Sequence, residues 1–297
     1  MLAYDFPLFR PPSEGDNLII QATLGCSFNQ CAFCSMYKSK DYRARPLAEV
    51  FADIDRAAAL WPDAQRVFLA DGDALVLPTD HLLALLEYLA RRLPALTRVS
   101  AYATPFNLLK KSAEELQSLK AHKLSLVYVG IESGADSILK RIVKSGVQTM
   151  EAGLRRAAEG GLKVSATVIL GLGGARHWQE HMEETAALIN RVPPTYLSTL
   201  QLFLEPDVRA RFLGHWGEEG FVFQEDEGIL AELELLLRRL APPRPVIFRS
   251  NHASNALALA GNLPKDSPRL LAQVAAARTA TAAGDASALR PGFLRRL

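Results

Sequence analysis

Three closely spaced cysteines are the residues of this sequence with the most definite chemistry. Cys26, Cys31 and Cys34 fall within nine positions, and the chain of 297 residues has no other cysteine. An odd, clustered set of thiols does not suit a framework of paired disulfides. Thiolates are ligands for soft metals and iron–sulfur clusters, and three of them can hold three irons of a cubane 4Fe-4S cluster while the fourth stays open. The spacing therefore predicts a catalytic iron–sulfur cluster.

A structural zinc site in an interaction module is the alternative for these thiols. Structural zinc sites take four ligands, often as two pairs, and the sequence has no second Cys-x-x-Cys pair. His177 and His181 stand four residues apart, a spacing that can bind a metal on one helix face. Because no third ligand accompanies them, we expect these two histidines to form a surface pair.

The hydrophobic pattern alternates between short β-rich runs and longer segments of helical period. We expect strands at residues 18–24, 66–71, 98–103, 125–131, 163–170 and 196–203. We expect helices at residues 47–61, 79–93, 112–121, 136–143, 149–159 and 176–191. Six βα units in series predict a parallel sheet with right-handed crossovers, and the chemistry then belongs at the carboxyl ends of the strands. The glycines at 171, 173 and 174 lack the full dinucleotide fingerprint, which favours a turn over a nicotinamide oxidoreductase.

The regular alternation of strands and helices ends after residue 206. Beyond it we expect a helix at 226–240, a strand at 246–250 and an Ala-rich helix at 264–283. The predicted organisation is an N-terminal arm at 1–17, a core at 18–206 and an extension at 207–297 packed on that core. No stretch approaches a membrane span or a signal peptide, and the net charge is +2, so we expect a cytoplasmic protein that does not bind nucleic acid. The basic residues of the loop after the cysteines are expected to be solvated: Lys38, Lys40, Arg43 and Arg45.

The cysteine segment resembles that of the radical S-adenosylmethionine superfamily. The strand at 18–24 leads directly into Gly25-Cys26-Ser27-Phe28-Asn29-Gln30-Cys31-Ala32-Phe33-Cys34, and the aromatic Phe33 before the last cysteine matches that superfamily. Four residues separate Cys26 from Cys31 here, whereas three are usual in the superfamily. The resemblance covers residues 18 to about 206, and the core is similar to methylthiotransferases and oxygen-independent coproporphyrinogen oxidases.

By this resemblance, several further residues would bind S-adenosylmethionine. Ala70-Asp71-Gly72-Asp73 is similar to the segment that holds its amino group, with Asp73 otherwise a cap for the next turn. Gly130-Ile131-Glu132-Ser133-Gly134 is similar to the segment in which Glu132 would accept hydrogen bonds from the ribose. Lys144 would hold the methionine carboxylate, or is an ordinary solvated charge at a helix end. The segment around Gly171 would pack against the adenine.

The resemblance implies a partial (β/α)6 TIM-like barrel with a C-terminal α/β extension. It implies an oxidoreductase in which a 4Fe-4S cluster reduces S-adenosylmethionine to yield a 5′-deoxyadenosyl radical that abstracts hydrogen from a small molecule. A flavodoxin or ferredoxin would supply the electron. Without further cysteines, a second all-cysteine cluster is excluded.

One polar segment near the C-terminus is not explained by the resemblance. Arg249, Asn251, His252 and Asn255 follow the strand expected at 246–250. They could recognise the substrate, with Arg249 holding an anionic group and His252 donating or accepting a proton. The alternative is a turn-rich loop whose side chains satisfy its own backbone.

Overall fold

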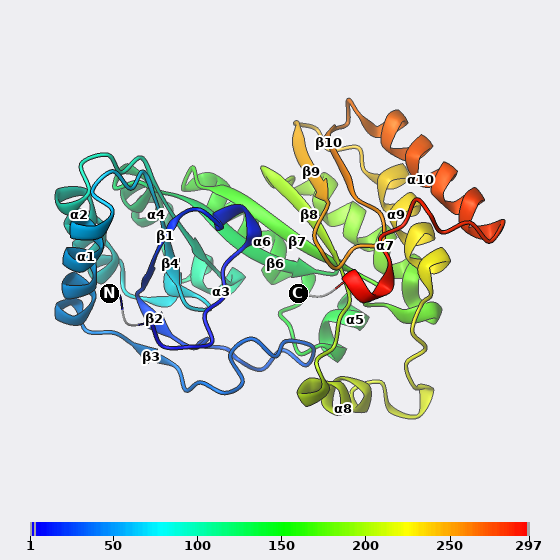
Figure 1. Cartoon of the computed structure of the whole chain (residues 1–297), viewed down its shortest axis with the longest axis horizontal. Coiled ribbons are helices and arrows are strands. Elements are labelled where there is room, and N and C mark those ends of the chain that lie inside the picture. Colours follow the sequence, from blue (N-terminus) through cyan, green and yellow to red (C-terminus); the bar gives the residue numbers. More distant parts are fainter. Residues whose placement is uncertain (1, 3, 296–297) are drawn as a thin grey trace. The chain divides into compact units, whose positions relative to one another are not determined.

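The computed structural model describes residue 2 and residues 4–295 (Figure 1). Residues 1, 3, 296 and 297, which belong to the predicted arm and extension, lie outside the described residues. The chain forms two compact units that interleave along the sequence. The first unit contains the chain up to Gln30, Cys34–Val129 and Ala152–Val164, and the second contains Cys31–Phe33, Gly130–Glu151 and the chain from Ser165 onward.

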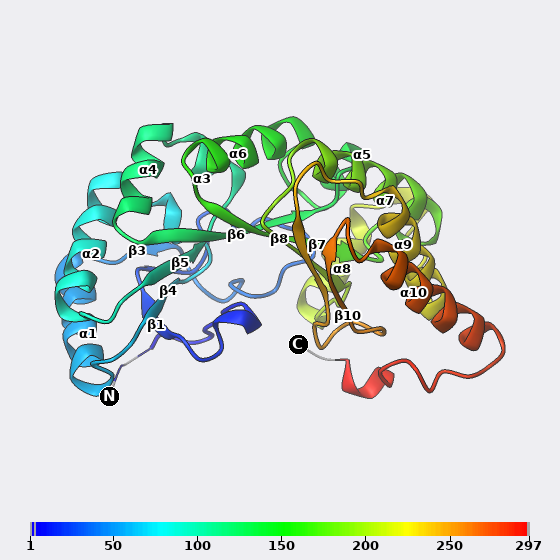
Figure 2. The same cartoon turned by 90° about the horizontal axis from the view of Figure 1, so that it is seen from above.

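The first unit is built on parallel strands flanked by helices. The strands run in the order β1 (Leu18–Gln21), β4 (Arg66–Ala70), β5 (Arg98–Tyr102) and β6 (Leu124–Glu132), whose last residues belong to the second unit. The helices are α1 (Leu47–Leu60), α2 (Thr79–Arg92), α3 (Pro105–Leu109) and α4 (Ala113–Ala121). Helix α6 (Val147–Glu159) is shared by both units. Figure 2 shows α1, α2 and α4 on one side of β1, β4 and β5.

The sequence pattern explains these elements. In β4, four successive residues from Val67 to Ala70 are fully buried, as expected for a parallel strand that is covered on both faces. In α1, Val50, Ile54 and Ala57 recur at helical spacing, and all three are buried.

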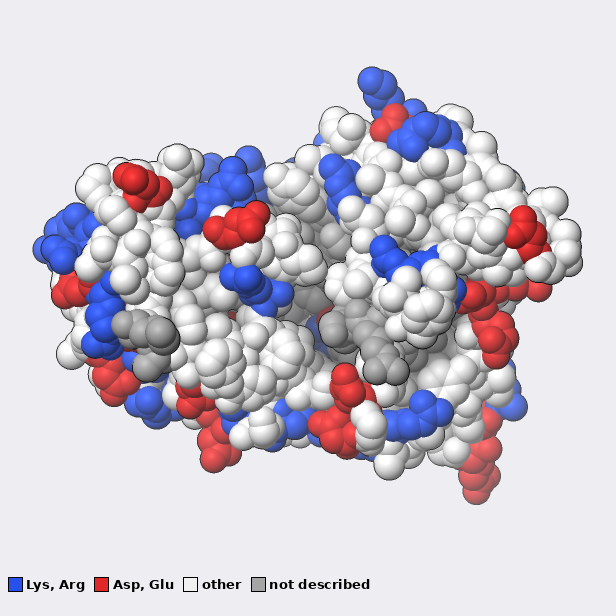
Figure 3. Space-filling model, in the orientation of Figure 1, with Lys and Arg blue, Asp and Glu red and all other residues white. Residues whose placement is uncertain are grey.

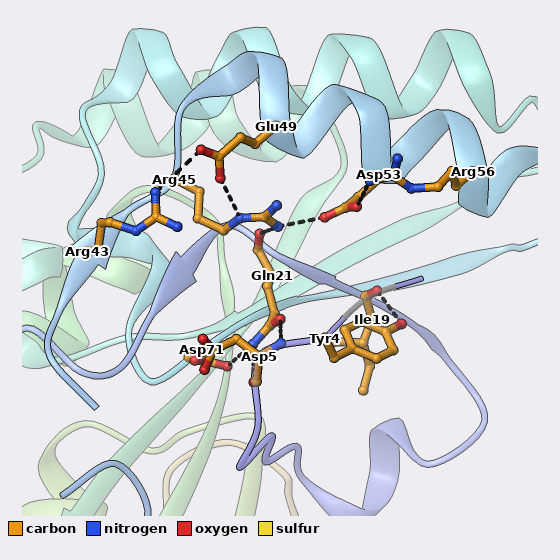
Figure 4. A network of polar contacts seen from close by, with 10 residues as sticks. All are labelled: Tyr4, Asp5, Ile19, Gln21, Arg43, Arg45, Glu49, Asp53, Arg56 and Asp71. Carbon is orange, nitrogen blue, oxygen red and sulfur yellow. Dashed lines mark hydrogen bonds and ion pairs between the residues drawn. The ribbon is translucent and has the colours of Figure 1, made fainter. Parts of the chain in front are cut away.

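A buried polar network joins the segment after the cysteines to β1 and β4. β2 (Thr23–Leu24) pairs antiparallel with β3 (Arg43–Ala44). The Lys40 side chain is 6 % exposed and its Nζ lies 2.9 Å from Asp5 Oδ1 and 3.0 Å from Asp71 Oδ2. Arg45 donates to Asp53 at 2.7 Å (Figure 4). The expectation that this whole basic segment is solvated is therefore wrong for Lys40 and Arg45, because both form ion pairs with carboxylates inside the protein.

The second unit carries a further set of strands and helices. β7 (Lys163–Leu170), whose first two residues belong to the first unit, pairs in parallel with β8 (Tyr196–Gln201), and β8 pairs in parallel with β9 (Val246–Ser250). β10 (Leu259–Leu263) pairs antiparallel with β9. The helices are α5 (Asp136–Arg141), α7 (Gly174–Arg191), α8 (Pro206–Gly214), α9 (Asp226–Arg239) and α10 (Ser267–Ala282). An apolar cluster of this unit joins residues from α5, β7, α8 and the segment after α8, among them Ile138, Ile169, Phe212 and Trp216.

The mostly parallel α/β architecture confirms the fold class predicted from the sequence. None of the helices within the described residues combines the length and the apolar character needed to cross a membrane. Basic and acidic side chains are interspersed on the face shown in Figure 3, consistent with the net charge of +2.

Candidate functional site

In the first unit, the cysteine loop is attached to the carboxyl end of β4. The Gly25 amide donates to Asp71 Oδ2 at 3.0 Å, and the Gly72 amide donates to Gly25 O at 3.0 Å. A Cβ atom at Gly72 would lie 2.7 Å from Cys26 Cβ and 3.0 Å from the Tyr37 ring, so only glycine admits this approach. Cys26 therefore sits where a parallel α/β fold places its chemistry.

Asp73 binds the cysteine loop from the same end of β4. Its carboxylate accepts a hydrogen bond from Ser27 N at 3.0 Å and a short one from Ser27 Oγ, and Asn107 Nδ2 lies 3.5 Å away. The side chain does not cap the turn that follows it, so the capping alternative is wrong. Burial raises the pKa of Asp73 above its usual range, against the lowering effect of these hydrogen bonds. The structure thus shows Asp73 next to Cys26, while its contact with a cofactor stays a prediction.

The donor set of this loop fits an iron–sulfur cluster. Cys26, Cys31 and Cys34 are all half-buried and none forms a disulfide. Burial raises the pKa of Tyr37 and of Tyr102, and the neighbouring sulfurs of Cys26 and Cys34 add to these two shifts respectively. Three thiols that form no disulfide are the kind of ligands that an iron–sulfur cluster requires.

Residues 31–33 belong to the second unit. The Ala32 amide donates to Ile142 O at 2.9 Å, and Phe33 packs against the apolar cluster of that unit. Phe33 therefore anchors the loop beside Cys31 and Cys34. Within residues 4–295, no three Cys, His, Asp or Glu side chains are gathered as ligands of a single metal ion.

Glu132 and Lys144 form a direct ion pair in the second unit. Glu132 Oε1 lies 2.6 Å from Lys144 Nζ, and the two side chains are 8 % and 14 % exposed. A Cβ at Gly130 would meet the Glu132 carboxylate and would lie 2.7 Å from Lys144 Nζ, so the pair occupies the space that a side chain would take there. The alternative that Lys144 is a solvated helix-end charge is wrong.

Ser133, which follows Glu132, is fully buried, and its hydroxyl has partners inside the protein. Ser133 Oγ lies 2.8 Å from His181 Nδ1 and accepts from Ala135 N at 3.1 Å. His181 is itself completely buried on α7, so the expected surface pair of His177 and His181 is wrong. The polar surroundings at Ser133 explain how an imidazole is tolerated there.

The predicted turn after β7 is confirmed, and a buried carboxyl group supports it. Gly171 has a φ of +82°, a conformation that favours glycine. Its amide donates to Glu232 Oε2 at 2.6 Å. Burial raises the pKa of Glu232 to about 8, despite its hydrogen bonds from Gly171 and Gln224. Sequence reasoning missed Glu232, although it lies on the buried face of the predicted helix three residues after Ile229.

The polar segment after β9 is divided between two faces of the sheet. A Cβ at Gly261 would lie 3.0 Å from side-chain atoms of Asp266 and Arg269, so the buried face of β10 and β9 is turned toward the start of α10. Arg249 pairs in register with Ser198 and lies on the opposite face. Within the described residues it has no carboxylate partner and donates to Phe248 O at 2.8 Å.

The side chains of His252 and Asn255 are bonded inside the protein, although Asn255 Oδ1 is buried without a partner among the described residues. His252 Nδ1 accepts from Ser254 N at 3.1 Å and lies 2.8 Å from Ser254 Oγ. Asn255 Nδ2 donates to Thr199 O at 2.7 Å. Burial and the nearby Arg290 lower the pKa of His252, which therefore stays neutral at pH 7. The structure does not bring Arg249 together with Asn255.

Solved structures resemble this chain in fold. The radical S-adenosylmethionine methyltransferase TsrM from Kitasatospora setae is 19 % identical, with a TM-score of 0.50 over 62 % of this chain and 36 % of TsrM. Coproporphyrinogen III oxidase (HemN) from Escherichia coli is 16 % identical, with a TM-score of 0.57 over 75 % of this chain and 52 % of that chain. Methylornithine synthase (PylB) is 15 % identical, with a TM-score of 0.51 over 76 % and 63 %. The chain spans less than two thirds of the length of each of these structures.

Comparison with sequence families gives the wider assignment. No individually curated protein sequence matches this chain. The family model described as "Radical SAM superfamily" matches residues 20–189, which is more than half of the chain and includes the cysteine loop and the ends of β4, β6 and β7. The chain belongs to the radical S-adenosylmethionine superfamily, and it is an enzyme of that family.

Proposed function

We propose that this protein binds a 4Fe-4S cluster through Cys26, Cys31 and Cys34 and uses S-adenosylmethionine to start a radical reaction on a small molecule. Enzymes of the superfamily use such a cluster and S-adenosylmethionine to generate a 5′-deoxyadenosyl radical. The observation that carries the proposal is the attachment of the Cys26 loop to the end of β4, through Asp71, Gly72 and Asp73. The comparisons do not support the zinc module considered as an alternative.

Residues of this chain would bind and orient the cofactor. Asp73 would hold the amino group of S-adenosylmethionine, Glu132 its ribose and Lys144 its carboxylate. The ion pair of Glu132 and Lys144 supports this, because it holds two groups able to bind polar parts of the cofactor side by side in a nearly buried place. Gly72, beside Cys26, and Gly171, in the turn after β7, would line the cofactor site at the ends of their strands.

Substrate recognition would involve Arg249 and His252. Arg249 lies on the face of β9 that is turned away from α10, where a guanidinium without a carboxylate partner among the described residues suits an anionic substrate group. His252 keeps Nδ1 occupied by Ser254, so its Nε2 would carry the exchangeable proton. Unchanged substrate-stimulated turnover in Arg249→Ala protein would remove Arg249 from this role. The electron would come from a flavodoxin or ferredoxin, and the enzyme would work in the reducing cytoplasm as an oxidoreductase.

Anaerobic reconstitution tests the cluster assignment. We expect the parent protein to take up iron and sulfide, to absorb in the visible region, and to release methionine and 5′-deoxyadenosine under reduction. Changing Cys26, Cys31 or Cys34 to Ala should abolish both properties, because each cysteine supplies one of three iron ligands. The Ser35→Ala variant is a matched control next to Cys34 and should behave like the parent. Zinc in place of iron, or full cleavage in a cysteine variant, would contradict the proposal.

A further inference from the structure

Buried His181 lies behind the segment that carries Glu132. Its Nε2 is 2.9 Å from Ile169 O at the end of β7, and its Nδ1 is 2.8 Å from Ser133 Oγ. A carbonyl oxygen only accepts hydrogen bonds, so Nε2 carries the proton and Nδ1 accepts from the Ser133 hydroxyl. Burial also lowers the pKa of His181 to about 4, which keeps the ring neutral in this arrangement. One imidazole therefore connects α7 to the ends of both β6 and β7.

A second residue of α7 holds the same segment one position further along. Gly134 N donates to Thr185 Oγ1 at 2.7 Å, and Thr185 Oγ1 donates to His181 O. A Cβ at Gly134 would lie 2.5 Å from Thr185 Cα, so the segment can approach the helix this closely only with glycine. Two successive residues after Glu132 are thus bonded to one turn of α7.

Glu132 itself has a backbone conformation that needs such support. Its φ is +65°, in the left-handed region that non-glycine residues seldom occupy. A residue persists there only when its surroundings hold it. The bonds at Ser133 and Gly134 come directly after Glu132, and they hold the chain in the orientation that directs its carboxylate to Lys144.

We propose that His181 is a positioning residue for S-adenosylmethionine binding, acting through Ser133 to hold Glu132 in its left-handed conformation. This inference rests on the proposed function, in which Glu132 binds the cofactor. His181 does not touch the cofactor itself, since both of its ring nitrogens are already bonded inside the protein. It acts as the support that keeps the carboxylate in place before the cofactor arrives.

The test is a double-mutant cycle on cluster-loaded protein, read as the dissociation constant of S-adenosylmethionine. His181→Leu keeps apolar bulk and removes both ring hydrogen bonds, and we expect it to weaken binding about three- to tenfold, as the loss of a hydrogen bond typically does. His181→Asn offers an amide oxygen to the Ser133 hydroxyl in place of Nδ1 and should recover part of the affinity. In the Glu132→Ala background, His181→Leu should have no further effect, because the group that it positions is gone.

Controls separate this role from general destabilisation. Iron content should stay at the parent level in all variants, and His177→Leu, one turn earlier on α7, should leave the affinity unchanged. Ser133→Ala provides the same test if His181→Leu does not fold. A His181→Leu effect that persists in the Glu132→Ala background, or no effect at all, would overturn the inference while Glu132 keeps its role. Unchanged binding in Glu132→Ala alone would instead overturn the proposed function of Glu132, and the inference with it.

Discussion

The missing side chain of Gly72 decides where Cys26 can lie. A methyl group there would stand 2.7 Å from Cys26 Cβ, closer than real Cβ contacts allow, and 3.0 Å from the Tyr37 ring. We predict that Gly72→Ala displaces Cys26 and lowers the iron content of reconstituted protein to less than about half, because a cluster needs all three thiolates in place. Iron and sulfide analysis with visible absorbance measures the effect.

Gly214 provides a control for the Gly72→Ala prediction, because a methyl group there would meet no neighbour. Gly214, at the end of α8, has no heavy atom within 4 Å of the place where its Cβ would be. Gly214→Ala should therefore load a full cluster. If Gly72→Ala protein also assembled a full cluster with parent-level cleavage, the loop would have another way to accommodate the methyl group.

Single residues mark the limit of what the sequence could predict. The three cysteines and the pairing partners Glu132 and Lys144 could be selected from their spacing and from resemblance. The burial of Lys40 and His181 could not, because their partners Asp71 and Ser133 are 31 and 48 residues away in the chain. Solvated and buried polar residues look alike in a sequence until the fold shows which long-range partner is present.

At the scale of elements, α9 supports the turn after β7 through one buried carboxyl group. Glu232 accepts from the Gly171 amide, and burial raises its pKa to about 8 from an ordinary value of 4.5. Between these two values the folded protein holds a proton that the unfolded chain has lost. Stability from this group is therefore fully present below pH 4.5 and is lost as the pH rises to about 8.

We predict that Glu232→Gln removes this pH dependence. An amide keeps an acceptor for Gly171 but does not ionise, so the parent should lose stability relative to the variant by up to about 1.4 kcal/mol per pH unit within that window. Urea unfolding of the apo protein at pH 5, 6, 7 and 8 measures the difference. A difference in unfolding free energy that stays constant with pH would show that Glu232 does not titrate there.

The elements themselves were largely predictable, and the exceptions have physical reasons. All six predicted strands of the core are present, because the strands of a parallel sheet are near-continuous apolar runs. Strand β10 was missed, since Gly261 and Asn262 interrupt its pattern with residues that disfavour strands. It forms because pairing with β9 and cover from α10 outweigh local preference.

At the scale of the whole molecule, the chain passes repeatedly between the two compact units. It changes unit after Gln30, after Phe33, after Val129, after Glu151 and after Val164. The described part of the predicted extension, residues 207–295, belongs to the second unit, as do β8 and the residues of β7 from Ser165 onward. Residues 18–206 thus contribute to both units, and the predicted division at 206 stays a prediction that truncation tests directly.

We predict that a chain ending at residue 206 does not fold. It would lose Phe212 and Trp216 from the apolar cluster, the partner of β8, and the carboxyl group that holds the Gly171 turn. Removing one large aromatic core residue typically lowers the free energy of unfolding by about 3–5 kcal/mol, and the total for a domain is about 5–15 kcal/mol. The combined loss therefore exceeds the stability of the folded state. Near-ultraviolet circular dichroism and resistance to proteolysis would report the loss.

A chain ending at Pro291 is the control, since it keeps these contacts and gives up one partly exposed ion pair of Arg295 with Asp226. A soluble 1–206 chain with a cooperative unfolding transition would show instead that the predicted core is autonomous and that the second unit is stable without α8, α9 and β9.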